Sequence, residues 1–292
     1  MYYLVYGLFY LISLLPLRIL YLLSDLTYFI IYYVTGYRKE IVLQNLSIAF
    51  PEKSDEEKNE IAKKFYRNFT DNFIETIKLI SAGENFINRH YSINVEVLDK
   101  LYEQNKKCQA HLGHNFNWEL ANNGMALLTP YKFLSVYMPI TNKVIDRLFL
   151  KLRTRTGAVM LPATEMRTAM LPYRDQKYLL ALVADQNPGV PSKAYWFNFF
   201  GTPTPFVKGP EKAARANDCA VLFAHIIKTK RGHYVAHLDL ATTEPRILPQ
   251  AELTKIYVQY LERVIKANPE MWLWTHRRWK HQWKPEYGEV IA

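Results

Sequence analysis

Cysteine is scarce in this sequence, and so are the short motifs that identify common enzyme chemistries. Only Cys108 and Cys219 occur among 292 residues, and they form no C-x-x-C pair. We therefore expect no disulfide framework and a reducing compartment. The patterns G-x-G-x-x-G after a strand, G-x-x-x-x-G-K-S/T, G-x-S-x-G and H-E-x-x-H are all missing. Their absence argues against dinucleotide-binding, phosphate-loop, serine-hydrolase and zinc-protease chemistry.

Acidic residues are also in deficit. The chain has 37 Lys and Arg against 27 Asp and Glu, so its net charge is +10 and its pI is about 9.3. This balance suits anionic partners such as nucleic acid, acidic lipid headgroups or an acidic carrier protein. Much of the positive charge lies beside tryptophans rather than along one basic helix, so we expect no nucleic-acid partner. Aromatic residues, at 14%, favour a membrane interface.

Residues 2–35 are almost wholly apolar. A membrane-spanning helix needs about 20 apolar residues, and this run is longer. Pro16, Arg18 and Asp25 interrupt it, which leaves two interpretations: one kinked and tilted span, or two shorter helices lying in one leaflet. A buried helix pair of a soluble protein is the less favoured alternative. No basic segment precedes the run and no small-residue cleavage site ends it, so a secretory signal is not indicated.

We therefore predict that residues 1–36 are a membrane anchor. The basic residues Arg38 and Lys39 follow it directly, and the positive-inside tendency then assigns the remaining chain to the cytoplasm. Residues 37–90 are expected to be helical, with a capping box of the S/T-x-x-E type before a long amphipathic helix. Residues 91–292 are expected to form the α/β core.

Strands and helices alternate through this core. The expected strands lie at 131–139, 158–162, 178–187, 220–229 and 234–241. The expected helices lie at 97–107, 118–128, 142–157, 164–176 (broken at Pro172) and 253–269. Short β-prone runs also occur between 91 and 111. This alternation predicts a single α/β domain with a mixed or mostly parallel sheet flanked by helices. There is no internal repeat or low-complexity linker.

The segment QAHLGHNFNWE joins a β-prone run to a helix-forming run. Turns of this kind expose their side chains at the sheet edge where α/β enzymes bind ligands. If Asn115 or Asn117 caps the helix, His114 lies just before its start and Glu119 lies in its first turns. We predict that the Glu119 carboxylate holds one imidazole nitrogen of His114 and leaves the other free to act as a general base. A functionless surface histidine is the alternative, because His-x-x-x-x-Glu alone is a weak pattern.

Four further polar residues are candidates for substrate binding. Arg153 and Arg155 lie at an expected helix end, where an arginine can grip phosphate or carboxylate with two parallel hydrogen bonds. Solvated charges at a helix C-terminus are the alternative. Asp185 and Gln186 end an apolar strand, although Asp185 could equally cap the following turn.

His111, His114 and Glu119 could ligate a metal, but without cysteine partners this is less favoured, and we expect no metal or other cofactor.

Two aromatic segments remain. The run FNFFG, residues 197–201, is expected to be a loop that forms an acyl-chain wall or a membrane contact, or else a core loop. Trp272, Trp274, Trp279 and Trp283 lie among arginines and lysines. They are expected to form an interfacial belt that contacts anionic headgroups. Cation–π packing on the protein's own surface is the alternative.

Taken together, these segments resemble the bacterial lipid A late acyltransferases, the lauroyl/myristoyl transferase family. The resemblance covers nearly the whole chain: the apolar N-terminus, then YRKEIVLQNLSIAFP, GHNFNWE, RTRTG, ADQN, the FFG and TP loop, and WLWTHRRWK, in this order. It implies a glycerolipid-acyltransferase-like fold. The family's His-x-x-x-x-Asp/Glu pair corresponds to His114 and Glu119, its central arginine to Arg153 or Arg155, and its strand-end aspartate to Asp185.

The resemblance also implies a reaction and its partners. The family moves a fatty acyl chain from acyl-acyl carrier protein to a hydroxyl of a lipid A precursor. The implied partners are acyl carrier protein, an anionic lipid acceptor and the cytoplasmic face of the bacterial inner membrane. The same chemistry on a lysophospholipid, aminolipid or glycolipid is one alternative. A non-catalytic lipid-binding protein and a metal-dependent hydrolase are others.

Overall fold

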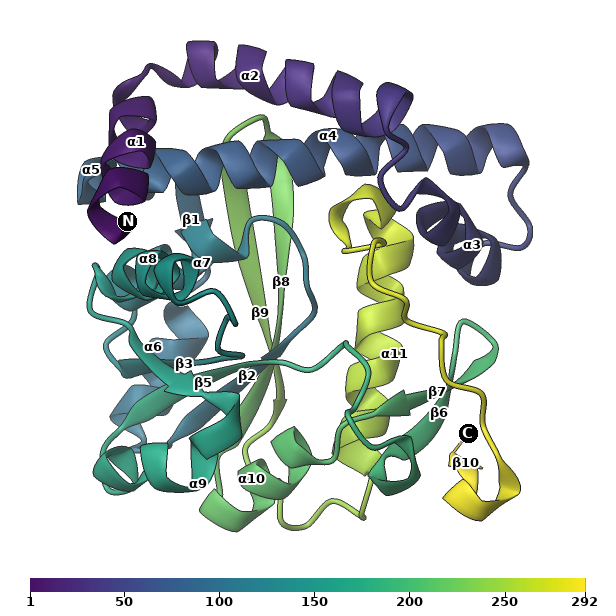
Figure 1. Ribbon diagram of the computed structural model, residues 1–292. Coiled ribbons are helices and arrows are strands. Elements are labelled where there is room, and N and C mark those ends of the chain that lie inside the picture. The colour runs from purple at the N-terminus through teal and green to yellow at the C-terminus, as the bar shows by residue number, and fades with distance from the viewer. Residues whose placement is uncertain (292) are drawn as a thin grey trace.

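The computed structural model, which describes residues 1–291, confirms the expected α/β fold (Figure 1). A seven-stranded sheet has the order β1-β9-β8-β2-β5-β3-β4, and only the β8–β9 pair is antiparallel. Its strands are β1 (Tyr91–Ile93), β2 (Cys108–Leu112), β3 (Lys132–Tyr137), β4 (Val159–Pro162), β5 (Tyr178–Val183), β8 (Ala220–Lys230) and β9 (His233–Thr242). A small second sheet contains β6 (Tyr195–Phe199), β7 (Thr202–Phe206) and β10 (Val290–Ile291).

Helices cover both faces of the large sheet. Those that matter below are α1 (Tyr2–Leu14), α2 (Leu17–Phe29), α3 (Lys39–Ala49), α4 (Asp55–Leu79), α6 (Glu96–Glu103), α7 (Trp118–Leu128), α8 (Lys143–Thr154), α10 (Gly209–Asn217) and α11 (Glu252–Ala267). Successive side chains of a strand point to opposite faces. In β2, Ala110 packs with Leu98 of α6 and Met125 of α7, whereas the His111 ring meets Tyr257 of α11. The core is therefore divided between two faces.

The N-terminal apolar run forms two helices, with a break at Leu15–Pro16. The segment Leu17–Val34 is long and apolar enough to cross a membrane by length and composition. In Figure 1, however, α2 lies along α4 instead of projecting from the molecule. Its polar side chains explain this position, because Tyr21 Oη donates to Glu75 at 2.8 Å and Ser24 Oγ donates to Asp71 at 2.8 Å.

The charge that interrupts the apolar run is also paired. Asp25 accepts hydrogen bonds from Arg231, whose guanidinium also binds Asp71 at 2.7 Å. Lys228 adds a second cation on Asp71, at 2.9 Å. The α4 helix that carries Asp71 begins at the predicted capping box, with Ser54 as its N-cap. α2 is thus fixed to the rest of the protein by polar contacts to Asp71, Glu75 and Arg231 as well as by apolar packing.

Three local predictions were wrong. Residues 164–176 form the single turn α9 (Met166–Ala169) between 3₁₀ turns, because Pro172 cannot continue a helix. The FNFFG run forms the end of β6 and the turn of the β6–β7 hairpin, and Phe199 is fully buried. The tryptophan belt is not formed, because Trp272 and Trp274 are buried and their ring N–H groups donate inside the protein. There, cation–π packing is observed, with the buried Arg278 lying 4.3 Å from a phenylalanine ring centroid.

Candidate active site

The register of the sheet brings His114 and Asp185 together. Strands β2 and β5 are parallel neighbours, with Leu112 paired with Val183. His114 and Asp185 each lie two residues beyond this pair, so both emerge at the carboxyl edge of the sheet. The His114 Nδ1 atom lies 2.5 Å from Asp185 Oδ1, and the backbone N–H of His114 donates to Oδ2 at 2.7 Å. One carboxylate therefore holds both the ring and the main chain of His114.

The environment of Asp185 keeps its carboxylate ionised. The side chain is 1% exposed, and burial alone would raise its pKa. The adjacent His114 and the hydrogen bonds from His114 and Trp272 outweigh burial and lower the pKa of Asp185 to about 2. Trp272 Nε1 donates to Oδ2 at 2.7 Å. Because an ionised carboxylate only accepts, its neighbour at Oδ1 must be the protonated Nδ1 of His114.

The other ring nitrogen of His114 is accessible. The side chain is 24% exposed, and Nε2 lies 3.3 Å from the amide Nε2 of Gln186. With Nδ1 carrying the proton, Nε2 has a free lone pair that can accept from the Gln186 amide or from a substrate hydroxyl. This is the arrangement of a general base held by a carboxylate.

Glu119 does not take the position expected from the sequence. Its carboxylate makes no hydrogen bond to His114 and instead binds Arg153, with Nε at 2.9 Å from Oε2 and Nη2 at 2.5 Å from Oε1. Glu119 is 2% exposed. Asn117 is the N-cap of α7, as one of the two predicted alternatives, and its Oδ1 accepts from the N–H of Leu120 at 3.2 Å. The first turn of α7 therefore turns Glu119 toward α8, and Asp185 supplies the carboxylate for His114.

Arg153 and Arg155 point to different places. Two positions along an α-helix differ by about 200° around its axis. Arg153 faces inward to Glu119, whereas Arg155 is exposed and donates to the backbone carbonyl of Ala82. The two arginines therefore do not form a joint phosphate clamp.

The start of α7 is also tied to the N-terminal helices. Asn117 Nδ2 donates to Glu75 Oε2 at 2.8 Å, and Tyr234 Oη donates to the same oxygen at 2.7 Å. The remaining oxygen of Glu75 accepts from Tyr21 of α2. Burial raises the pKa of Glu75, and these three donors satisfy it. A polar chain thus runs from α2 through α4 to the turn that carries His114.

The C-terminal segment closes one side of the site. Asn115 forms an isolated antiparallel bridge with Trp272, and the Phe116 N–H donates to Met271 at 3.1 Å. Arg278 is fully buried and binds Asn187 Oδ1 at 3.0 Å, and burial lowers its pKa to about 10. No motif in the sequence indicated that Trp272 would contact Asp185. Trp272 and Glu75 contact the candidate site through Asp185 and Asn117, and the sequence did not reveal either contact.

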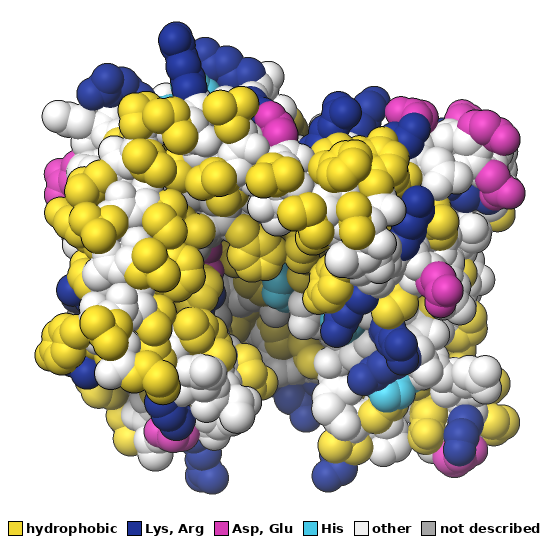
Figure 2. Space-filling view, turned by 45° about the horizontal axis from the view of Figure 1, so that its top comes forward, with side chains coloured by type: hydrophobic (Ala, Val, Ile, Leu, Met, Phe, Trp, Pro, Cys, Tyr) yellow, Lys and Arg dark blue, Asp and Glu magenta, His cyan; other side chains and the backbone are white. Residues whose placement is uncertain are grey.

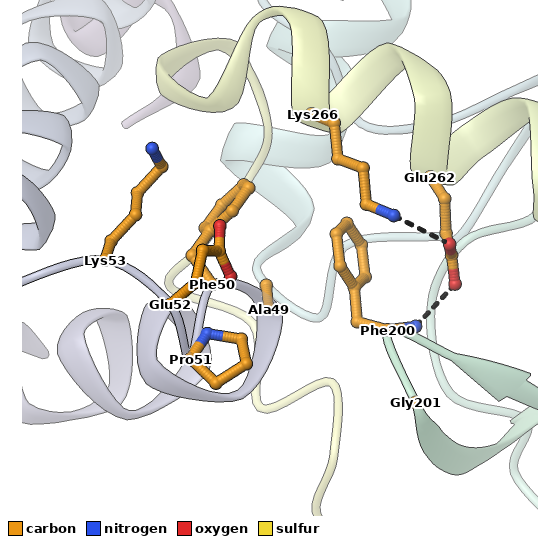
Figure 3. A pocket seen from close by; sticks show the side chains of 9 residues that line it. All are labelled: Ala49, Phe50, Pro51, Glu52, Lys53, Phe200, Gly201, Glu262 and Lys266. Atoms are coloured by element: carbon orange, nitrogen blue, oxygen red, sulfur yellow. Dashed lines mark hydrogen bonds and ion pairs between the residues drawn. The ribbon is translucent and has the colours of Figure 1, made fainter.

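Figure 2 shows a hollow in the middle of one face of the molecule, with a histidine side chain at its floor. Hydrophobic side chains surround much of the hollow, and Lys and Arg side chains gather on one side. A different cavity, of about 500 Å³, lies between the end of α3, the β6–β7 turn and α11 (Figure 3). One of its two carboxylates, Glu262, is bound by the Phe200 N–H and by Lys266. None of the predicted site residues lines that cavity.

The alternative metal site is not assembled. His111 is buried against Tyr257 and Phe223, and burial lowers its pKa to about 3. Within residues 1–291, no three His, Cys, Asp or Glu side chains are grouped so that they could hold a metal ion.

Comparisons with known proteins indicate the family of the chain. The profile described as "Bacterial lipid A biosynthesis acyltransferase" matches residues 1–281. The chain is similar to the lipid A biosynthesis palmitoleoyltransferase of Escherichia coli (strain K12), with 23% identity over 248 residues, 83% of this chain and 79% of that protein. It is similar to the same extent to a lipid A biosynthesis acyltransferase of Shigella flexneri.

Proposed function

Because the chain belongs to the bacterial lipid A biosynthesis acyltransferase family, we propose that it transfers a fatty acyl chain from acyl-acyl carrier protein to a hydroxyl of a lipid A precursor. The observation that carries the proposal is the His114–Asp185 pair at the carboxyl edge of the sheet, with the His114 side chain 24% exposed and only the Gln186 amide beside its Nε2 atom. A hydroxyl is a poor nucleophile near neutral pH, so this transfer needs such a base.

The proposed reaction is a direct transfer. Nε2 of His114 removes the acceptor hydroxyl proton while the oxygen attacks the thioester carbonyl carbon. Asp185 stabilises the imidazolium that forms. The carbon–sulfur bond then breaks, and the imidazolium returns the proton to the thiolate of the carrier's prosthetic arm. The N-terminus of α7, with its positive dipole end, stabilises the oxyanion. No covalent enzyme intermediate and no metal are involved.

Glu119 and Arg153 have a supporting role in this proposal. Their buried ion pair packs beside the first turn of α7, and the Trp118 ring N–H also donates to Glu119 at 3.2 Å. A fixed Glu119–Arg153 pair keeps the start of α7 in place beneath the acceptor. Gln186 occupies Nε2 of His114 in the resting site and yields this position to the acceptor hydroxyl.

Two kinds of exposed surface support the proposed partners. The outer faces of α1 and α2 carry exposed apolar residues, which suit the cytoplasmic leaflet of the bacterial inner membrane. The most exposed of these residues are Tyr3, Leu4, Leu11 and Leu22. Arg277 and Lys280 are exposed beside the Asn187 turn, since the Arg277 carbonyl accepts from Asn187 at 2.7 Å. We assign these two cations to docking of the acidic carrier protein.

The test is to supply membranes with labelled acyl-acyl carrier protein and to identify the acylated product by mass spectrometry. We expect an ester on a lipid A precursor, formed equally well in the presence of a chelator. A labelled lysophospholipid, aminolipid or other glycolipid would assign the same chemistry to another acceptor. Free fatty acid whose release stops with chelator would contradict the proposal.

A further inference from the structure

One face of α8 carries a row of cations. Arg147, Lys151 and Arg155 are spaced by four residues and are all exposed. Because residues four apart lie on the same helix face, they form one stripe. Arg153 lies on the other side of the helix, bound to Glu119. Arg155, the C-cap residue, keeps helical dihedral angles and so continues the stripe by one step.

The cationic stripe faces a ladder of tyrosines on α1. The Arg147 guanidinium lies 4.2 Å from the centroid of the Tyr2 ring, and Lys151 Nζ lies 3.9 Å from that of Tyr6. The two rings stack on each other at 5.9 Å. Arg155, Lys151 and Tyr6 also line a pocket of about 190 Å³. The floor of this pocket is apolar and consists of Ile80, Leu148 and Leu152.

Nothing acidic compensates the stripe. Within residues 1–291, no carboxylate oxygen lies within 4.0 Å of the charged groups of Arg147, Lys151 or Arg155. By contrast, Arg231, which lies beside α2, is paired with Asp25 and Asp71. Like charges four residues apart on a helix repel each other, so an anion bound along the stripe would stabilise it.

The position of the stripe beside an exposed apolar face indicates what kind of anion would bind along it. The opposite side of α1 exposes Leu4, Leu8 and Leu11, at 79%, 59% and 65%. Figure 2 shows hydrophobic side chains over the part of the molecule where α1 lies in Figure 1. Tyrosine rings favour the level at which acyl chains meet headgroups, and lysine and arginine favour headgroup phosphates at the same level.

We propose that the α8 stripe and the α1 tyrosines form a seam that binds the phosphate groups of anionic phospholipids. The seam fixes the depth and rotation of the protein on the leaflet, at a place separate from His114. This inference rests on the proposed membrane association and not on the proposed chemistry.

The test compares two double variants of the full-length protein that lose the same net charge. One is Arg147→Gln with Lys151→Gln, and the control is Lys132→Gln with Lys212→Gln, on β3 and α10, where both lysines are exposed. Each is floated with vesicles of phosphatidylcholine alone or mixed with phosphatidylglycerol. One basic residue near such a surface contributes about fivefold in affinity, so the stripe variant should lose roughly 25-fold on the mixed vesicles only. The control should change little.

Two further measurements complete the test. Arg147→Lys should retain binding, because it keeps the charge. Acyl transfer in detergent micelles should be unaltered in the stripe variant, which distinguishes loss of the seam from loss of the chemistry. Equal losses in the two double variants would show a net-charge effect and overturn the proposal. So would wild-type binding by the stripe variant, or a raised acceptor KM in micelles, since the latter would assign the stripe to the acceptor.

Discussion

Replacing Asp185 with asparagine changes one atom at the proposed centre of the reaction. Oδ2 of Asp185 accepts from the His114 N–H and from Trp272, whereas Oδ1 faces Nδ1 of His114 alone. The asparagine oxygen will therefore take the Oδ2 position, where it accepts from the His114 N–H and from Trp272. The amide nitrogen then faces Nδ1 and donates to it. This forces the ring proton onto Nε2, and the lone pair needed for general-base catalysis is lost.

The expected loss is that of a positioned base. We expect kcat for acyl transfer to fall by about 10²–10⁴-fold, with little change in acceptor KM. Purified protein in detergent micelles with labelled acyl-acyl carrier protein provides the assay, and circular dichroism verifies folding. The exposed Asp175→Asn variant is the matched control. Turnover by Asp185→Asn within threefold or so of wild type would refute the role given to Asp185.

The same substitution has a pH signature in stability. The pKa of Asp185 is about 2 in the folded protein, against about 3.9 in an unfolded chain. A lowered folded-state pKa stabilises the protein above the unfolded pKa, by roughly 2.5 kcal/mol here, and the contribution is lost as pH falls toward 2. The difference in free energy of unfolding between wild type and Asp185→Asn should therefore shrink as the pH is lowered from about 4 toward 2. A difference that stays constant over this range would contradict the assignment.

Three further predictions follow from the buried polar groups. Glu119→Ala leaves the Arg153 cation unpaired, so it should lower the free energy of unfolding by about 3–5 kcal/mol and kcat by orders of magnitude. Thermal melting measures the first effect, and an unchanged melting temperature would contradict it. Asp71→Asn should be similarly costly, whereas Asp25→Asn, in a more exposed pair, should cost less than about 1 kcal/mol; the opposite order would be inconsistent with the structure. Deleting residues 1–36 removes the α2 donors to Asp71 and Glu75, so the product should aggregate or leave the membrane fraction. A truncated chain that still pellets with membranes and resists salt extraction would move the anchor to the C-terminal segment.

The sequence predicted the architecture better than it predicted the site. Apolar runs with helical or alternating spacing located most core strands and helices, because these patterns report burial directly. The order of the strands is a different matter. β2 and β5 are neighbours although β3 and β4 lie between them in the chain, so nothing local indicated that His114 and Asp185 would meet. Glu119, five residues from His114, was the nearer partner along the chain but not in space.

The other incorrect predictions also failed because they depended on contacts that the local sequence does not show. Tryptophans beside arginines have the composition of a membrane interface. Whether they are buried depends on partners that the composition does not reveal, such as the distant Asp185 for Trp272 and the nearby Pro269 carbonyl for Trp274. Arg153 and Arg155 are two residues apart and therefore lie on different faces of α8. The sequence did not show which of them would bind Glu119.

The most direct test of the proposed mechanism is the turnover of purified His114→Ala. Nε2 of His114 is the atom to which we assign the removal of the acceptor proton. The variant should remain folded and bound to vesicles, because α1 and α2 are held by contacts that do not involve His114. It should show no acyl transfer above the rate measured without enzyme. Transfer near the wild-type rate by a folded, membrane-bound His114→Ala protein would contradict the mechanism.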